Sequence, residues 1–445
     1  MATIKRALIV ASITLMAAFF LNMSVPLAAQ EQQIIHADTS IMAGFPPPVE
    51  KRVTLENWQH QPFNHWSFMH MEQVMRTALV DRGVGPITPL PKLPISLSSL
   101  KFKSPEGKEI TVLEALIEID SNGYLLIKDG KIIFEYYANG FSPRMRHLTQ
   151  SAGKSVSGTL AAVLIAEGVL DENKLVTEYL PEMRGSAYEK ATLRHVMNMT
   201  AGIKYSEDYY DPNAEVYKHE ISHAWKPAKE GMSSTLYDFL PTLKEKDREH
   251  GVHFEYCSAH TDVLAWIIER ATGSKLTEIL SDRLWSQLGA ENDALYTVDD
   301  AGTATANGGF SVSLRDFGRF GQMLLQNGFY NGRQIVPAKV VDGFFGGDHA
   351  KFMKSQKGQL LSKELPTFFS KGAYQDQWWA MDVDIKDRTL ALGSFGNLLY
   401  LDRKRNVVMV QLATQRVNGD IPIKRLEFKM LEALLAELEK QVLTR

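Results

Sequence analysis

A serine and a lysine three positions apart, Ser151 and Lys154, stand at the start of an apolar, helix-forming stretch of this chain. Residues i and i+3 share one face of a helix, so the lysine amine can lie beside the serine hydroxyl and take its proton. A serine in the first helical turn also lies among free backbone N–H groups, at the positive end of the helix dipole. Both features favour the oxyanion that forms when a serine oxygen attacks a carbonyl. The spacing therefore predicts a nucleophile, Ser151, with Lys154 as its general base.

Helical periodicity distinguishes this motif from a second copy of the same spacing. After Lys154 the apolar side chains fall on one helical stripe, and Gly168 can end the helix. The stripe consists of Val156, Leu160, Val163 and Leu164. The second copy, Ser98-Ser99-Leu100-Lys101, lies between Pro94 and Pro105 and has no helical run after it. We therefore expect this second copy to be extended chain or loop.

Two other motifs that share these residues fail at one position each. Gly153-Lys154-Ser155 is similar to the end of a phosphate-binding P-loop, but Leu148 stands where that loop needs its first glycine. The G-x-S-x-G elbow of the α/β-hydrolases would need a glycine at position 157, where the chain has Ser157.

A serine–lysine pair also needs a proton donor for the leaving group and donors for the oxyanion. Tyr256, followed by Cys257 and Ser258, precedes a helical run, and a phenol there can carry the serine proton to the leaving group. A strand broken by glycines, Gly393 to Gly396, can bring its backbone close to a ligand. Taken singly, Tyr256 could be an ordinary half-buried tyrosine and the glycines a bulge in an edge strand. The order and spacing of the three elements together favour the catalytic interpretation.

These three elements resemble the motifs of the class C β-lactamase-like serine hydrolases, and Tyr-Cys-Ser is similar to the 6-aminohexanoate-dimer hydrolase branch of that family. The chain is also similar to the family eight carboxylesterases. The resemblance covers residues 44–412 and implies a β-lactamase/transpeptidase-like fold. It further implies that Ser151 is the nucleophile, Lys154 the base and Tyr256 the proton donor, and that the N–H groups of Ser151 and Ser394 form the oxyanion hole. The residues expected to face the substrate are Tyr209, Glu220, Ser258, Trp379, Gly393 and Phe395.

The chain departs from the lactamase pattern at three places. Ala391-Leu392-Gly393 stands where lactamases usually carry K-T-G, Ser258 replaces an asparagine, and Phe395 replaces a histidine frequent in the amide-hydrolase branch. We therefore expect a serine hydrolase that cleaves a small amide or ester through an acyl-enzyme on Ser151. A β-lactamase or D-Ala-D-Ala carboxypeptidase is the alternative on the same fold, and a non-catalytic binding protein is the alternative from another class.

An acidic stretch surrounds Tyr209. It contains Glu207, Asp208, Asp211, Glu215 and Glu220, with Lys218 as its only basic residue. Clustered acids attract cations, so this stretch predicts a substrate that is cationic or neutral at its Tyr209 end. A solvated loop face is the alternative interpretation.

Secondary-structure signals predict how the three elements come together. Two β-rich runs, 124–128 and 131–137, flank Asp129-Gly130, a typical hairpin turn. Three short strands are expected over 389–394, 397–401 and 407–412, before an amphipathic helix with apolar residues from Ile423 to Val442. The fold class is therefore α/β (α+β), with an antiparallel sheet from both chain ends, flanked by helices, and an inserted all-helical lobe. We expect an N-terminal extension over 30–100, a sheet lobe over 101–150 and 335–440, and a helical lobe over 151–334.

The first 29 residues have the pattern of a secretory signal peptide. Lys5-Arg6 precede an uncharged run and a small-residue site ending at Ala29, so we expect export to the periplasm or medium, with an uncleaved membrane anchor as the alternative. Cys257 is the only cysteine, which excludes an internal disulfide. The net charge of −3 argues against nucleic acid as a partner. The twelve histidines are scattered along the chain, so we expect a small-molecule substrate, no metal and no cofactor; the sequence leaves the oligomeric state open.

Overall fold

The computed structural model describes residues 34–209 and 211–443. The chain divides into two units, Met1–Ile34 and Ile35–Arg445, and the fold described here is that of the second. The predicted signal peptide, residues 1–29, lies outside the described residues. Within the described part of the chain, no helix is both long enough and apolar enough to cross a membrane.

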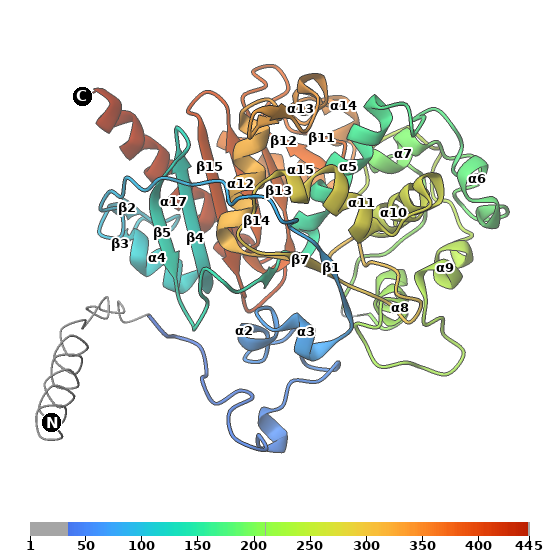
Figure 1. Cartoon of the computed structure of the whole chain (residues 1–445), viewed down its shortest axis with the longest axis horizontal. Coiled ribbons are helices and arrows are strands. Elements are labelled where there is room, and N and C mark those ends of the chain that lie inside the picture. The colour runs from blue at the N-terminus through green and yellow to red at the C-terminus, as the bar shows by residue number, and fades with distance from the viewer. Residues whose placement is uncertain (1–33, 210, 444–445) are drawn as a thin grey trace, which may run out of the picture. The chain divides into compact units, whose positions relative to one another are not determined.

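A seven-stranded antiparallel sheet forms the half of this unit that carries the chain's last strands (Figure 1). Its strand order is β11-β12-β13-β14-β15-β4-β5. Two strands come from the early part of the chain, β4 (Ser121–Lys128) and β5 (Lys131–Tyr137). The other five are β11 (Ala373–Gln375), β12 (Trp378–Ala380), β13 (Arg388–Leu392), β14 (Leu398–Asp402) and β15 (Val407–Ala413). Because β4 pairs with β15, the sheet is assembled from both chain ends, as the sequence predicts; β11 and β12 were not predicted.

The turn between β4 and β5 has the predicted hairpin geometry. Asp129 and Gly130 have φ values of 51° and 74°, so both central residues are left-handed. This is the arrangement of a type I′ turn, whose twist matches that of the flanking strands. Lys128 and Lys131 are therefore directly opposite each other in the ladder.

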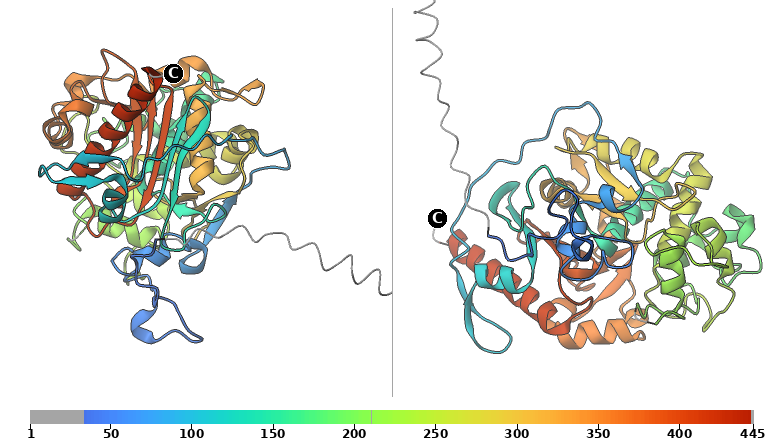
Figure 2. Two further views of the ribbon diagram at one scale, coloured as in Figure 1. Left: turned by 90° about the vertical axis from the view of Figure 1, so that its left-hand side faces the viewer. Right: turned by 90° about the horizontal axis from the view of Figure 1, so that it is seen from below.

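Helices cover both faces of the sheet. On one face, α12 (Leu314–Leu325) packs against β4, β14 and β15. Gly318 and Gly321 permit a close approach of this helix to the sheet, because a Cβ at Gly318 would lie 2.6 Å from the Leu125 side chain. Side chains alternate along β15, so Val408 and Val410 join this core while Gln411 faces the opposite side. There Gln411 donates a hydrogen bond of 2.7 Å to Glu427 of the predicted C-terminal helix α17 (Ile421–Leu443). The first view of Figure 2 shows α17 along that face.

The remaining half of the unit is mostly helical. The longest helices there are α5 (Lys154–Ala166) and α10 (Ala259–Thr272), which pack against each other and against α11 (Leu276–Arg283), while α7 (Leu193–Met197) packs on α10. The predicted helix after Ser151 is present, and left-handed Gly168 (φ 76°) follows its end. It differs from the expectation in one detail, because a 3₁₀ turn over Gln150–Gly153 precedes α5 and contains Ser151.

A second, smaller sheet of four strands lies next to the helices and was not predicted. It has the order β1-β7-β8-β6 and comprises β1 (Thr77–Val80), β7 (Ala294–Thr297), β8 (Phe310–Val312) and β6 (His147–Leu148). Its strand β6 leads directly into the 3₁₀ turn of Ser151, and the Thr149 amide donates to the carbonyl of Phe310, the first residue of β8. This sheet therefore fixes the chain just before the serine.

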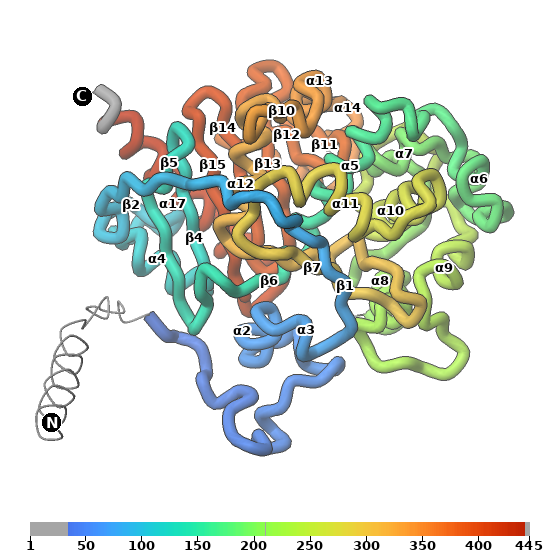
Figure 3. The backbone as a smooth tube through the Cα atoms, in the orientation of Figure 1, coloured from blue at the N-terminus to red at the C-terminus, as the bar shows by residue number. Residues whose placement is uncertain are grey.

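The segment before residue 101 lies along the surface of both halves. After α2 (Asn64–Ser67), α3 (Met71–Val74) and β1, it runs across the α12 side of the unit toward β2 (Figure 3). On the way, the Thr88 carbonyl accepts a hydrogen bond from Arg319 of α12, and residues 91–95 exchange backbone hydrogen bonds with Ile132 and Ile133 of β5. Trp58 is buried and donates from Nε1 to the Trp225 carbonyl.

The other elements are short. The helices are α4 (Val112–Glu118), α6 (Val176–Tyr179), α8 (Glu215–Ser222), α9 (Leu236–Phe239), α13 (Ala338–Gly343), α14 (His349–Phe352), α15 (Gln356–Glu364) and α16 (Pro366–Phe369). Two hairpins pair β2 (Lys101–Lys103) with β3 (Glu109–Thr111), and β9 (Phe329–Tyr330) with β10 (Arg333–Gln334). The second serine–lysine motif thus ends in strand β2 rather than in a helix, as predicted.

Candidate active site

Ser151 and Lys154 are in direct contact. The Lys154 Nζ lies 2.9 Å from the Ser151 Oγ and 3.2 Å from the Ser258 Oγ, and it also donates to the Asn307 carbonyl. Gln150, just before the serine, has a left-handed φ of 51°, a conformation that is costly for a residue with a side chain and is often found at functional sites. The sharp turn places the serine hydroxyl against the lysine amine.

The burial of Lys154 changes its protonation. Only 1% of the residue is exposed, and burial lowers its pKa from 10.5 to about 8, although the carboxylates of Glu207 and Asp262 oppose this shift. An amine with a pKa near 8 is partly neutral at neutral pH and can accept a proton.

Tyr256 lies on the other side of the serine. Its phenol hydrogen-bonds to Ser151, and burial raises its pKa well above the usual value of 10, so the hydroxyl stays protonated. The ring stacks on Trp379 with centroids 5.6 Å apart, while the Lys154 Nζ is 5.2 Å from the tyrosine centroid. The arrangement holds a neutral phenol within hydrogen-bonding reach of Ser151, where it can give up a proton.

The third element reaches the serine through a glycine. A Cβ on Gly393 would lie 2.3 Å from the Thr149 carbonyl oxygen and 3.0 Å from the Ala152 amide nitrogen, so only glycine permits this approach. Gly393 directly follows strand β13, and Ser394 begins the 3₁₀ turn that comes next. Phe395 within that turn is left-handed, with φ 60°. The strand thus brings Ser394 beside Ser151.

Two adjoining cavities open beside Ser151. The first, which we call the Tyr256 cavity, has a volume of about 160 Å³ and is lined by Tyr256, Lys357 and Lys424 among others. The second, the Glu220 cavity, has about 240 Å³ and is lined by Glu220, Lys226 and Arg416 among others. Both are lined by Ser151, Tyr209, Ser394, Phe395 and Asn418.

All of the residues expected to face the substrate lie in these walls. Tyr209 and Phe395 line both cavities, Trp379 and Gly393 line the Tyr256 cavity, and Glu220 and Ser258 line the Glu220 cavity. The structure brings these residues together around Ser151, and their roles remain predictions.

The basic residues of the cavities were missed. Lys357 on α15 has its Nζ 3.8 Å from the Tyr256 ring centroid, and Lys424 comes from α17. A basic residue was expected only at the third motif, and nothing in the sequence pattern around Lys357 marks it as a site residue. The acids near Tyr209 are also partly engaged, since Glu207 accepts the Ser258 N–H at 2.7 Å and Glu220 pairs with Lys226 at 3.1 Å. These contacts and the lysines weaken the expected preference for a cationic substrate.

Comparison with known proteins places the chain in a family. The profile of the family described as Beta-lactamase matches residues 111–432. A 6-aminohexanoate-dimer hydrolase from Paenarthrobacter ureafaciens is 36% identical over 372 residues, which cover 84% of this chain and 91% of that protein.

Solved structures agree with this result. A candidate 6-aminohexanoate-dimer hydrolase from Bacillus anthracis has a TM-score of 0.80 and 27% identity, with 88% of this chain and 99% of that chain covered. EstCE1, a hydrolase with promiscuous acyltransferase activity, has a TM-score of 0.55 at 14% identity, with 72% and 96% covered, and shows the fold alone. The chain belongs to the β-lactamase family, in its 6-aminohexanoate-dimer hydrolase branch, and is a serine hydrolase of amide or ester bonds.

Proposed function

We propose that Ser151 is the nucleophile of this hydrolase and that Lys154 is its base. The observation that supports this most directly is the 2.9 Å contact between the Lys154 Nζ and the Ser151 Oγ, made by a lysine that is almost fully buried. Neutral Lys154 takes the hydroxyl proton as the Ser151 oxygen attacks the substrate carbonyl. The N–H groups of Ser151 and Ser394 receive the negative charge that develops on the carbonyl oxygen.

The proton then moves to the leaving group. Tyr256 hydrogen-bonds to Ser151 and is neutral, so it can protonate the departing amine or alkoxide, and the proton that Lys154 took from Ser151 then restores the phenol. Breakage of the amide or ester bond leaves an acyl-enzyme on Ser151. A water molecule, deprotonated by the same groups, hydrolyses this ester and releases the acid.

The position of Tyr256 indicates which part of the substrate each cavity would hold. Tyr256 lines only the first cavity, so the leaving group occupies the Tyr256 cavity and the acyl group occupies the Glu220 cavity. Lys357 faces the leaving group there and can bind a carboxylate at its far end. Glu220 can bind an ammonium on the acyl side, where the ammonium has to replace Lys226.

A basic side chain on the leaving-group side and an acidic side chain on the acyl side fit a linear amide formed from ω-amino acids. The 6-aminohexanoate dimer, named for the Paenarthrobacter relative, releases an amine whose other end is a carboxylate. We therefore propose a substrate of this class, or the corresponding ester. Lys357 also supplies the basic group that the third motif lacks, so β-lactam hydrolysis remains a second candidate function.

Export is part of the proposal. Lys5-Arg6 and the uncharged run after them support a cleaved signal peptide ending at Ala29. Amino-terminal sequencing of the protein secreted from a bacterial host should begin at Gln30.

Labelling with a fluorophosphonate tests the nucleophile. One adduct per chain should form, and peptide mapping should place it on Ser151, because its hydroxyl lies 2.9 Å from the amine of buried Lys154. Ser151→Ala should abolish both the adduct and turnover of p-nitrophenyl esters and linear amides, with nitrocefin tested in parallel. Ser98→Ala is the matched control and should behave as wild type. Labelling that persists in Ser151→Ala would overturn the assignment.

The pH dependence of kcat/KM tests the base. Lys154 must be neutral to take a proton, and burial lowers its pKa to about 8, so kcat/KM should rise with pH through a limb centred near pH 8. Lys154→Arg should lose at least about 10²-fold in kcat, since guanidinium does not deprotonate in proteins. A limb near pH 10, or a Lys154→Arg variant with normal kcat, would mean that another group is the base.

The neighbouring residues Tyr256 and Cys257 should differ in effect. Tyr256→Phe keeps the ring on Trp379 and removes only the hydroxyl, so kcat should fall by about 10²–10⁴. Burial raises the pKa of the Cys257 thiol far above its usual value, and the side chain packs in the core, so Cys257→Ala should retain turnover. An equal loss in both variants would indicate a local folding effect.

Matched substrates test the role of Lys357. An amide with a carboxylate at the end of its leaving group should be preferred over the same amide capped as a neutral carboxamide. Lys357→Met keeps the length of the side chain but removes its charge, and should reduce this preference about tenfold, equivalent to 1.4 kcal/mol. The control, exposed Lys354→Met, should leave the preference unchanged. An unaltered preference in Lys357→Met would show that the carboxylate binds elsewhere.

A further inference from the structure

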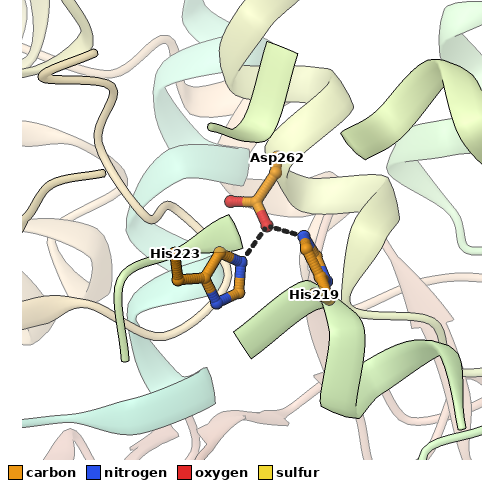
Figure 4. A group of neighbouring side chains, drawn as sticks. All are labelled: His219, His223 and Asp262. Carbon is orange, nitrogen blue, oxygen red and sulfur yellow. Dashed lines mark hydrogen bonds and ion pairs between the residues drawn. The ribbon is translucent and has the colours of Figure 1, made fainter. Parts of the chain in front are cut away.

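Three metal-ligating side chains converge at the buried end of the Glu220 cavity. His219 and His223 are four residues apart on and just after α8, and Asp262 lies in the first turn of α10 (Figure 4). The Asp262 Oδ2 is 3.1 Å from the His219 Nε2 and 3.3 Å from the His223 Nε2. All three residues are at most 2% exposed. An H-E-x-x-H pattern at residues 219–223, His-Glu-Ile-Ser-His, was overlooked in the sequence, and the third member, Asp262, lies 39 residues after His223.

His219 is held in a fixed orientation. Its Nδ1 is 2.8 Å from the Tyr205 hydroxyl, and its ring stacks on Phe239 with centroids 4.8 Å apart. Its Nε2 is buried and makes no well-aligned hydrogen bond, despite its short distance to Asp262. In metal-bound histidines the outer nitrogen is typically fixed by such a partner while the inner nitrogen faces the ion.

The cluster also contains a buried carboxylate. Asp262 is 2% exposed, and within the part of the chain that the structure describes its ion-pair partners are the imidazoles of His219 and His223. The Lys154 amine does not contact this carboxylate, because its hydrogen bonds go to Ser151, Ser258 and the Asn307 carbonyl. A cation between the carboxylate and the two imidazoles would compensate the buried charge.

We propose that His219, His223 and Asp262 bind a divalent transition-metal ion, with Zn²⁺ as the best match. Two imidazole nitrogens and one carboxylate oxygen are a donor set that Zn²⁺ prefers, and their ligand atoms all lie within 4.8 Å of one another. Small rotations of the side chains suffice to bring them to metal–ligand distances of about 2.0–2.2 Å.

Asn307 can supply a fourth ligand. Its Nδ2 lies 2.5 Å from the Asp262 Oδ2 and 2.9 Å from the His223 Nε2. Turning this amide by half a rotation presents its oxygen in place of its nitrogen. His219, His223 and Asn307 line the Glu220 cavity, so an ion can enter through it. The backbone N–H of Asn307 also donates to the Asp262 Oδ1 at 3.0 Å, and its backbone carbonyl accepts from Lys154. The ion would therefore be linked to the catalytic lysine through one residue.

Metal titration of the full, untagged, chelator-treated chain tests the site. By calorimetry we expect one Zn²⁺ per chain with a dissociation constant in the micromolar range or tighter, together with an increase in Tm, since an ion that binds only the folded state stabilises it. Co²⁺ should give the intense visible absorption of a four-coordinate N/O site, and Zn²⁺ should displace it.

Variants assign the ligands by binding rather than by activity. His223→Gln and Asp262→Asn should each weaken Zn²⁺ binding by at least about tenfold, whereas His253→Gln, which alters a half-buried histidine outside the cluster, should bind as wild type. Asn307→Asp adds a second carboxylate and should tighten binding, a gain that misfolding cannot produce. No stoichiometric ion in the wild type, or equal affinity in wild type and His223→Gln, would overturn the proposal.

Discussion

The amine of Lys154 is withdrawn from water and surrounded by oxygen atoms, and the geometry of the site depends on this placement. An ammonium ion is poorly solvated in a protein interior, so burial favours the neutral amine, the form that can accept a proton. The two hydroxyls and one carbonyl around it belong to Ser151, Ser258 and Asn307, residues far apart in the sequence. Each of the corresponding chain segments must therefore be correctly folded before the lysine acquires its properties.

The two halves of the unit supply different parts of this environment. Helix α5 begins at Lys154, and helix α10 begins directly after Ser258. Both helices are packed in the main hydrophobic core. The large sheet contributes Gly393 at the end of β13, where contact with the Thr149 carbonyl leaves no space for a side chain. The turn after β13 and the 3₁₀ turn before α5 meet at Ser151, so packed segments of both halves position the reacting groups.

The sequence predicted most of the elements that surround Ser151 and fewer of the groups that line its cavities. Ser151, Lys154 and Tyr256 lie in local motifs, and β4, β5 and α17 have strong turn or periodicity signals. Strands β11 and β12 have only three residues each, too few for periodicity to show. Lys357 was missed because its proximity to the site arises from tertiary packing between distant segments, which no local pattern records. In the His219–Asp262 cluster, the two histidines lie in a local H-E-x-x-H pattern that was overlooked, and only the approach of Asp262 depends on tertiary packing.

The backbone pairing of residues 91–95 with β5 has a consequence for how the protein behaves in solution. β5 is the last strand of the large sheet on that side, and an open outer strand is a template for β-pairing between molecules. The Leu93 and Ile95 amides donate to the carbonyls of Ile132 and Ile133, so part of this border is already occupied by the chain's own N-terminal segment. That segment therefore protects the edge strand β5 from pairing with other molecules. A chain shortened by removal of this segment would expose the β5 edge and be prone to aggregation, even if every residue around Ser151 were retained.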